Sequence, residues 1–308
     1  MAKLTKDKLD ALIFIDTNIF LDFYRIRRTD VSLKYFDEII NHKDLIIISS
    51  QVEMEYKKNR QSAILESISE VTKKTQLNIS CPAILTEALE LKTIKKSKET
   101  IDLQQKKLKV KIENILKFPN RHDNVYKSLE KIFTNKSSIN LNRENKLRFS
   151  IRNLAKKRFI LGYPPRKKGD NSIGDAINWE WIIDCAIKSG KSIIIVTRDS
   201  DFGSIYESES YLNDWLLQEF KQRVGARRKI ILTDKLSKAF KLVEIPVTKD
   251  MIEEEEKIIQ NSKLQEQIDL LQEILNKNFY EKPGFKSITG SEIGKFMDSI
   301  SFIKNKKL

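Results

Sequence analysis

The sequence predicts an α/β protein built around a central parallel sheet, and two features support this prediction. Three apolar runs, at 11–15, 45–49 and 192–196, have the length and the β-branched content of strands that are buried on both faces. Helical patterns lie between these runs. Strands that alternate with helices form a parallel sheet with helices on its faces, because the crossover connections are right-handed.

The first two strands are each followed by a helix signal. Residues 11–15 lead into Asp16, Thr17 and Asn18 and then into a helical pattern. An amphipathic helix is predicted at 31–42, before the second strand. A serine pair after this strand can cap a helix that starts near Gln51.

The middle of the chain, from 62 to 160, has a different character. Helical periodicity dominates it, and a polar stretch at 134–142 is typical of a loop. Lys and Arg outnumber Asp and Glu there by 22 to 10. We interpret this segment as a basic helical insertion with a nucleic-acid surface. The alternative is a long helical hairpin whose charges face only water.

The second half of the chain returns to the α/β pattern. A loop at 161–174 contains Arg166, Lys167 and Lys168, and Asp175 opens a helix that Gly190 ends. The third strand is followed by the predicted elements 212–224 (helix), 229–232 (strand) and 236–240 (helix). An acidic run at 253–256 then starts a polar helical extension, which we expect to be exposed or packed on a partner.

These patterns predict three regions. They are an α/β domain formed by 1–61 and 161–246, the basic helical insertion 62–160, and the helical C-terminal extension 247–308.

The composition limits the chemistry of the protein. Lys and Arg number 57 against 43 Asp and Glu, so the net charge is +14 and favours a polyanionic partner such as nucleic acid. Cys81 and Cys185 belong to no Cys/His cluster, and the chain has only two histidines, which argues against zinc. We expect a cytoplasmic protein, since no signal peptide or membrane span is evident.

Acidic residues lie where the predicted strands end and where helices begin at the same sheet edge. Asp16 and Asp199 follow strands, Glu55 and Asp175 lie near helix starts, and Asp201 is two residues beyond Asp199. Any one of them alone is more often a helix cap than a ligand. Several carboxylates packed together repel one another, however, and a divalent cation removes this conflict. Oxygen-only ligands indicate Mg²⁺ or Mn²⁺, and two such ions can activate water and stabilise the leaving oxygen in phosphodiester cleavage.

Four blocks of the sequence resemble, in order, those of the PIN-domain ribonucleases. The blocks are IDTNIFLDFY, SSQVEMEYKKNR, GDAINWEWIIDCA and IIIVTRDSDFG, and the close match covers 11–24, 51–60 and 162–203. The spacing is most similar to larger bacterial PIN-like proteins with a helical insertion. The resemblance implies a three-layer α/β/α sandwich with a central parallel sheet and metal-dependent endonuclease activity, usually on RNA.

The resemblance also implies roles for individual residues. Asp16, Glu55, Asp175 and Asp199 match the acidic metal ligands, Asp201 matches an auxiliary acid, and Asn18 matches the companion of Asp16. Thr17 and Thr197 can bind carboxylate or phosphate. Glu53 competes with Glu55 but lies about 200° around the helix, so both cannot face the site. Arg60 can contact phosphate or form a structural ion pair, and further substrate contacts are expected from Arg166, Lys167, Lys168 and Arg198.

The leading hypothesis is a Mg²⁺- or Mn²⁺-dependent endoribonuclease that acts by two-metal catalysis on single-stranded or structured RNA. By analogy with the family, it would serve in bacterial antiviral defence or as a toxin-like effector. The alternatives are a DNA-directed nuclease with the same site and an inactive nucleic-acid-binding scaffold. The C-terminal helix is a candidate for self-association or for binding a protein partner.

Overall fold

The structure, a computed structural model, describes residues 8–68, 82–85, 87–166, 172–207 and 209–280. The chain divides into two compact units, Met1–Ile258 and Ile259–Leu308. The central sheet and all of the predicted acidic residues belong to the first unit. Within the described part of the chain, no helix is both long enough and apolar enough to cross a membrane.

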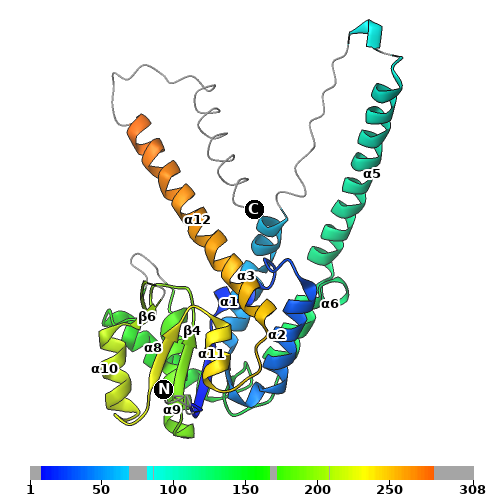
Figure 1. The fold of residues 1–308 in the computed structure, drawn as a ribbon. Coiled ribbons are helices and arrows are strands. Elements are labelled where there is room, and N and C mark those ends of the chain that lie inside the picture. Colours follow the sequence, from blue (N-terminus) through cyan, green and yellow to red (C-terminus); the bar gives the residue numbers. More distant parts are fainter. Residues whose placement is uncertain (1–7, 69–81, 86, 167–171, 208, 281–308) are drawn as a thin grey trace, which may run out of the picture. The chain divides into compact units, whose positions relative to one another are not determined.

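Within the described residues, the central sheet has five strands in the order β3-β2-β1-β4-β7 (Figure 1). These strands are β1 (Ala11–Ile15), β2 (Ile46–Ser49), β3 (Asn140–Leu141), β4 (Ser192–Val196) and β7 (Ile230–Thr233). Every neighbouring pair is parallel, with Ile13 of β1 opposite Ile46 of β2 and Ile194 of β4. The predicted α/β fold with a central parallel sheet is therefore confirmed.

Helices and one hairpin complete the described structure. The α-helices are α1 (Thr17–Asp22), α2 (Thr29–Asn41), α3 (Ser50–Ser67), α5 (Leu89–Lys117), α6 (Pro119–His122), α7 (Asn124–Phe133), α8 (Leu147–Ile160), α9 (Gly174–Ser189), α10 (Asp214–Arg223), α11 (Leu236–Leu242) and α12 (Lys249–Tyr280). Short 3-10 turns are η1 (Lys43–Leu45) and η2 (Ala83–Leu85), and the antiparallel hairpin joins β5 (Gly203–Tyr206) to β6 (Glu209–Leu212).

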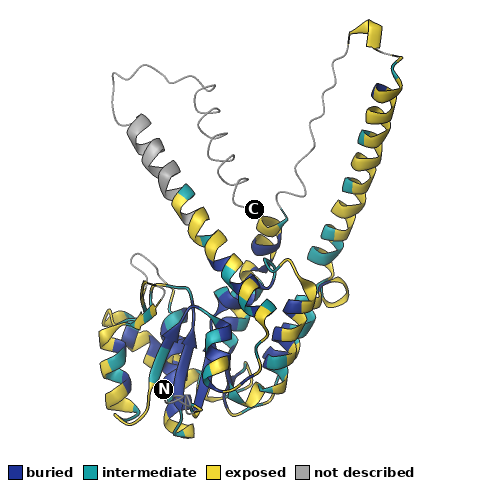
Figure 2. Ribbon diagram, viewed as in Figure 1, coloured by how far each residue is buried: buried dark blue, intermediate teal, exposed yellow. Residues whose placement is uncertain are grey.

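The two central strands are buried along their whole length, as Figure 2 shows in dark blue. Successive side chains of a strand point to opposite faces of the sheet, so complete burial of β1 and β4 means that both faces are covered. The fully buried Trp181 connects two further strands, because its indole N–H donates to the carbonyl oxygens of Ile48 and Ile139. The core therefore holds the carboxyl edge of the sheet rigidly.

Local capping explains where the helices near this edge begin and end. The Ser49 hydroxyl accepts from the Val52 N–H and starts α3 directly after β2, which agrees with the predicted serine cap. Gly190 ends α9 with a φ of 65°, a conformation that glycine adopts without strain. The predicted serine cap and glycine end are thus both present.

The stretch 134–142 is largely irregular, as predicted, but it also contains a short strand that was not predicted. Asn140 and Leu141 pair in parallel with Ile48 and Ser49 of β2 and form the edge strand β3. A two-residue strand has no periodicity to detect in the sequence, and its partner lies about 90 residues away in the chain. Long-range pairing alone defines this element.

Part of the predicted insertion, 62–160, belongs to the core of the first unit. Leu129 and Phe133 of α7, and Ile151 and Ala155 of α8, join the main apolar cluster. By contrast, α5 exposes most of its length (Figure 2). Among the described residues, α5 therefore has the surface character expected of a basic insertion, whereas α7 and one face of α8 belong to the core.

The start of the C-terminal extension also packs on the core. Met251 of α12 is buried in the apolar cluster, and Glu254 and Glu255 are buried although the sequence predicts a polar, exposed helix. The hairpin β5–β6 is a further element that the sequence analysis missed. The weakly patterned end of the chain, from 281, lies outside the described residues.

Candidate active site

Asp16 lies at the carboxyl end of β1 and is buried, with 5% of its surface exposed. One carboxylate oxygen accepts from the Thr17 N–H at 2.6 Å, which makes Asp16 the N-cap of α1. The other oxygen accepts from the Asn18 amide at 2.9 Å and from the Thr197 hydroxyl at 2.5 Å. Side chains at the ends of β1 and β4 therefore fix the orientation of this carboxylate.

Glu55 reaches the same edge from the second turn of α3. Its carboxylate accepts from the Thr17 hydroxyl at 3.0 Å and from the Gln51 amide at 2.6 Å. Gly174, at the start of α9, lies so close that a methyl group there would be 2.3 Å from Glu55 Oε1. Glu53 instead pairs with Lys57 at 2.7 Å, so the structure brings Glu55, and not Glu53, to Asp16.

Asp175 joins this group from the first turn of α9, and its electrostatics show which residues surround it. Burial is the largest cause of the rise in its pKa to about 8, and the carboxylates of Asp16, Glu55, Asp201 and Asp199 contribute to the same rise. Asp175 therefore lies close enough to the other four predicted acids to interact with each of them.

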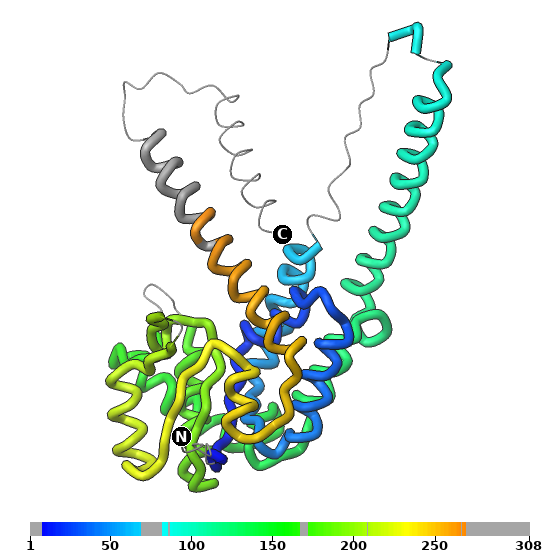
Figure 3. Tube along the Cα trace, in the orientation of Figure 1, coloured from blue at the N-terminus to red at the C-terminus, as the bar shows by residue number. Residues whose placement is uncertain are grey.

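Asp16 responds to the same surroundings. Its pKa is raised to about 6, and burial is the largest cause of the rise. The hydrogen bonds from Thr197 and Thr17 lower this pKa, whereas the charges of Glu55 and Asp199 raise it. Asp199 and Asp201 lie in the loop between β4 and β5, whose path can be followed in Figure 3. The Asp199 N–H donates to the Thr197 hydroxyl at 2.9 Å, which ties this loop to Asp16 through Thr197.

The donor set suits a divalent cation that prefers oxygen ligands. The five acids provide carboxylate oxygens only, and positive charge among them would remove the repulsion that raises the pKa of Asp16 and Asp175. The absence of a side chain at Gly174 leaves room beside Glu55. Among the described residues, no three acidic, histidine or cysteine side chains are already close enough together to form a metal-binding group.

Three of the residues that position the acids were predicted from the sequence, and two were not. Asn18, Thr17 and Thr197 are all hydrogen-bonded to the acids, as described above. The missed residues are Gln51 and Gly174. Gln51 lies one helical turn before Glu55, a spacing that predicts a side-chain contact, whereas the close approach of Gly174 depends on how α9 meets α3.

Arg60 does not lie at the candidate site, which corrects its proposed contact with phosphate. Its guanidinium is buried and donates to Asp123 at 2.7 Å and to the Ile115 carbonyl at 2.7 Å. Tyr24 also donates to Asp123, at 2.7 Å. Because the guanidinium N–H groups already donate to these partners, Arg60 forms the structural ion pair that was the alternative to a phosphate contact.

Arg198 is likewise turned inward, which argues against a substrate contact. It forms an ion pair with Asp22, and burial lowers its pKa while the charges of Glu255 and Asp234 raise it. Arg166 is exposed, and its guanidinium lies 4.5 Å from the centre of the Phe159 ring. Lys167 and Lys168 lie outside the described residues.

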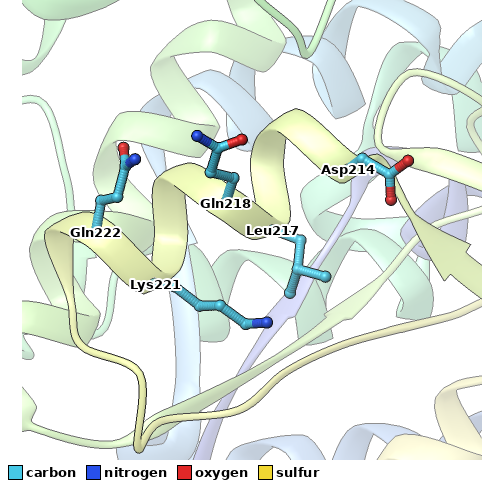
Figure 4. A pocket seen from close by; sticks show the side chains of 5 residues that line it. All are labelled: Asp214, Leu217, Gln218, Lys221 and Gln222. Carbon is cyan, nitrogen blue, oxygen red and sulfur yellow. The ribbon is translucent and has the colours of Figure 1, made fainter.

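A surface hollow lies on α10, and none of the five acids lines it. Its lining comes from one helix, and Figure 4 shows it with the side chains of Asp214, Leu217, Gln218, Lys221 and Gln222. One acidic group beside a lysine and two amides offers no cluster comparable with the one around Asp16. We therefore place the candidate site at the sheet edge.

The fold and the acidic cluster define an α/β domain with a candidate cation-binding edge. The family model described as "PIN domain" matches residues 13–202, which is more than half of the chain and includes all five acids. The chain therefore belongs to the PIN domain family, a family that consists generally of nucleases. Neither curated proteins nor solved structures gave a match to this chain.

Proposed function

We propose that this protein is a Mg²⁺- or Mn²⁺-dependent endoribonuclease. One observation supports this most strongly, namely that acids from four distant parts of the chain meet at one sheet edge, where burial and neighbouring carboxylates raise the pKa of Asp16 and Asp175. A fold gains nothing in stability from such repulsion, so a function that uses the charges explains it best. The net charge of +14 favours a polyanionic substrate.

Asp16, Glu55, Asp175 and Asp199 would hold the cations, with Asp201 as an auxiliary ligand. When bound, divalent cations polarise a phosphate group and lower the pKa of water. In the proposed reaction, water attacks phosphorus and the bond to the 3′ oxygen breaks, which leaves a 5′-phosphate and a 3′-hydroxyl end. The chain's own task is to hold the acids in place.

Hydrogen bonds support that task. Thr197 and Asn18 donate to Asp16, and Gln51 and Thr17 donate to Glu55, so neither carboxylate rotates freely. The positions of Asp16 and Glu55 are thereby fixed before a substrate arrives.

We expect Asp16→Asn and Asp199→Asn to reduce cleavage of single-stranded RNA by about a hundred-fold or more, since each removes a ligand charge. Asparagine caps helices as well as aspartate does, so Asp16→Asn leaves α1 intact. The measurement is the cleavage rate of labelled single-stranded RNA, single-stranded DNA and tRNA with Mn²⁺ or with chelator. Faster cleavage of the DNA would assign the site to DNA instead.

Asp184→Asn is the matched control, because Asp184 lies on α9 like Asp175 but pairs with Lys188 at 2.7 Å. This variant keeps full activity if the site is assigned correctly. Mn²⁺ raises the melting temperature of the wild type and not of Asp16→Asn. Cleavage that persists in both site variants, or no cleavage by the wild type with any metal, contradicts the proposed function.

A further inference from the structure

Two exposed aromatic side chains form a pair that neither the core nor the acidic cluster uses. Tyr163 and Trp215 have ring centres 5.0 Å apart and ring planes at 44°. They remain 39% and 45% exposed. Because the rings are tilted instead of stacked in parallel, each one keeps part of a face open to solvent. Large exposed aromatic side chains are typical of binding surfaces.

A main-chain hydrogen bond connects the start of α10, where Trp215 lies, to the segment that carries Asp199 and Asp201. Asn213 is the N-cap of α10, and its N–H donates at 2.9 Å to the carbonyl of Phe202, the residue after Asp201. Tyr163 follows the end of α8, and α8 packs on α9, the helix whose first turn contains Asp175. Each ring therefore belongs to an element that adjoins a segment with a candidate acid.

A buried charge network joins the helices next to the two rings. Arg158 of α8 forms ion pairs with Glu180 of α9 and Glu219 of α10. Its main-chain carbonyl accepts from the Tyr163 N–H at 3.1 Å. The Trp179 indole N–H also donates to Glu219, at 3.2 Å. Because this network fixes α8 and α10 to each other through α9, Tyr163 and Trp215 are held near each other before anything binds.

We propose that Tyr163 and Trp215 form a stacking platform for a base of single-stranded nucleic acid. The inference rests on the proposed function, because the platform would hold a single strand for cleavage by the same protein. Bases stack on aromatic side chains without sequence preference, and the exposed Arg166 adds a cation for the backbone. A base-paired duplex hides its base faces, so this platform selects single strands.

Trp215 is also a natural probe for the test. The chain has three tryptophans, and Trp179 and Trp181 are fully buried, so acrylamide quenching reports mainly on Trp215. The full chain is titrated in chelator with a labelled oligouridylate of about a dozen nucleotides, and with a duplex of equal length. We expect the oligouridylate to protect Trp215 from acrylamide, whereas the duplex leaves the quenching unchanged.

Variants separate stacking from charge. Trp215→Ala weakens binding of the oligouridylate by roughly five- to a hundred-fold without changing the salt dependence, and Trp215→Phe restores most of the affinity. Arg166→Gln instead makes the salt dependence shallower. Ile187→Ala is the control, because Ile187 is 53% exposed near the opposite end of α9, and it binds like the wild type.

The titration in chelator does not depend on cleavage, so it tests the platform separately from the proposed function. Equal affinity of Trp215→Ala and wild type, or loss of affinity that Trp215→Phe does not restore, overturns the platform. If the oligouridylate does not change the quenching, the platform is also overturned, and the partner of these two rings would instead be a protein. Binding that depends on Trp215 without any cleavage in Mn²⁺ supports the platform and contradicts the nuclease.

Discussion

Gly174 shows how one missing side chain shapes the candidate site. A methyl group at this position would lie 2.3 Å from Glu55 Oε1 and 2.7 Å from Gln51 Nε2. Both atoms are at the ends of flexible side chains, so the fold can absorb Gly174→Ala by moving them. The acid would then leave its hydrogen-bonded position.

We therefore expect Gly174→Ala to fold normally but to cleave RNA about ten- to a hundred-fold more slowly, since displacement by about 1 Å has effects of this size. Thermal unfolding checks the fold, and cleavage rates across a Mn²⁺ titration check the site. The variant should need more Mn²⁺ for half-maximal activity. Wild-type rates at every Mn²⁺ concentration would show that the position of Glu55 is unimportant.

Buried charges at residue scale have two different roles in this molecule. Arg60 and Asp123, like Arg158 and Glu180, pair directly and satisfy each other. The pKa of Asp16 and of Asp175 is instead raised by burial and by neighbouring carboxylates. Pairing fixes the packing of helices, whereas unbalanced charge of one sign is a mark of a functional site.

At the scale of elements, the first turns of α12 are held by one buried carboxylate. Glu255 accepts from the N–H groups of Leu236 and Ser237 and so satisfies the start of α11. Tyr35 also donates to it, at 3.3 Å. A side chain of α12 therefore caps the start of α11, and this interaction joins the two helices.

Burial raises the pKa of Glu255 above its ordinary value of 4.5, against hydrogen bonds from Ser237 and Leu236 that lower it. The unfolded chain therefore loses this proton at lower pH than the folded one. Stability from this group is full below pH 4.5 and decreases as pH rises through the folded pKa. Glu255→Gln has no such proton to lose.

We expect the free energy of unfolding of the wild type, relative to Glu255→Gln, to be larger at acidic pH than at mildly alkaline pH. Urea unfolding of both proteins at several pH values measures this, and the difference between them cancels the other titrating groups. Glu253→Gln is the control, because Glu253 is exposed. A difference that stays constant with pH would refute this account of Glu255.

At the scale of the whole molecule, one long exposed helix presents a series of positive charges. The 29-residue helix α5 exposes a lysine series that includes Lys106 and Lys107. Contacts between lysines and phosphates release counterions, so such a helix makes binding of nucleic acid depend strongly on salt. The basic surface would collect substrate, and the acids would act on it.

We expect the double change Lys106→Gln and Lys107→Gln to weaken binding of single-stranded RNA and to flatten the plot of log affinity against log salt by about 0.7 for each lost phosphate contact. Fluorescence anisotropy at several salt concentrations measures the slope. The control removes equal charge at Lys188 and Lys238, which already pair with Asp184 and Glu209. Equal slopes for both double variants would exclude α5 as the binding surface.

The sequence by itself determined the parallel sheet and the location of the acids. Buried parallel strands need continuous apolar runs, and this local signal predicted β1, β2, β4 and β7 to within about one or two residues. Residues that follow such strands must lie at one edge. Asp16 and Asp199 could therefore be placed without a structure, as could the end of α9 at Gly190.

Only the tertiary structure decided the rest, because it depends on contacts between segments far apart in the chain. The pairing of β3 with β2, the burial of Arg60 against Asp123, and the capping of α11 by Glu255 have no local signal. The same holds for the pair of Tyr163 and Trp215. Sequence patterns report which residues prefer burial, whereas packing decides which partners they meet.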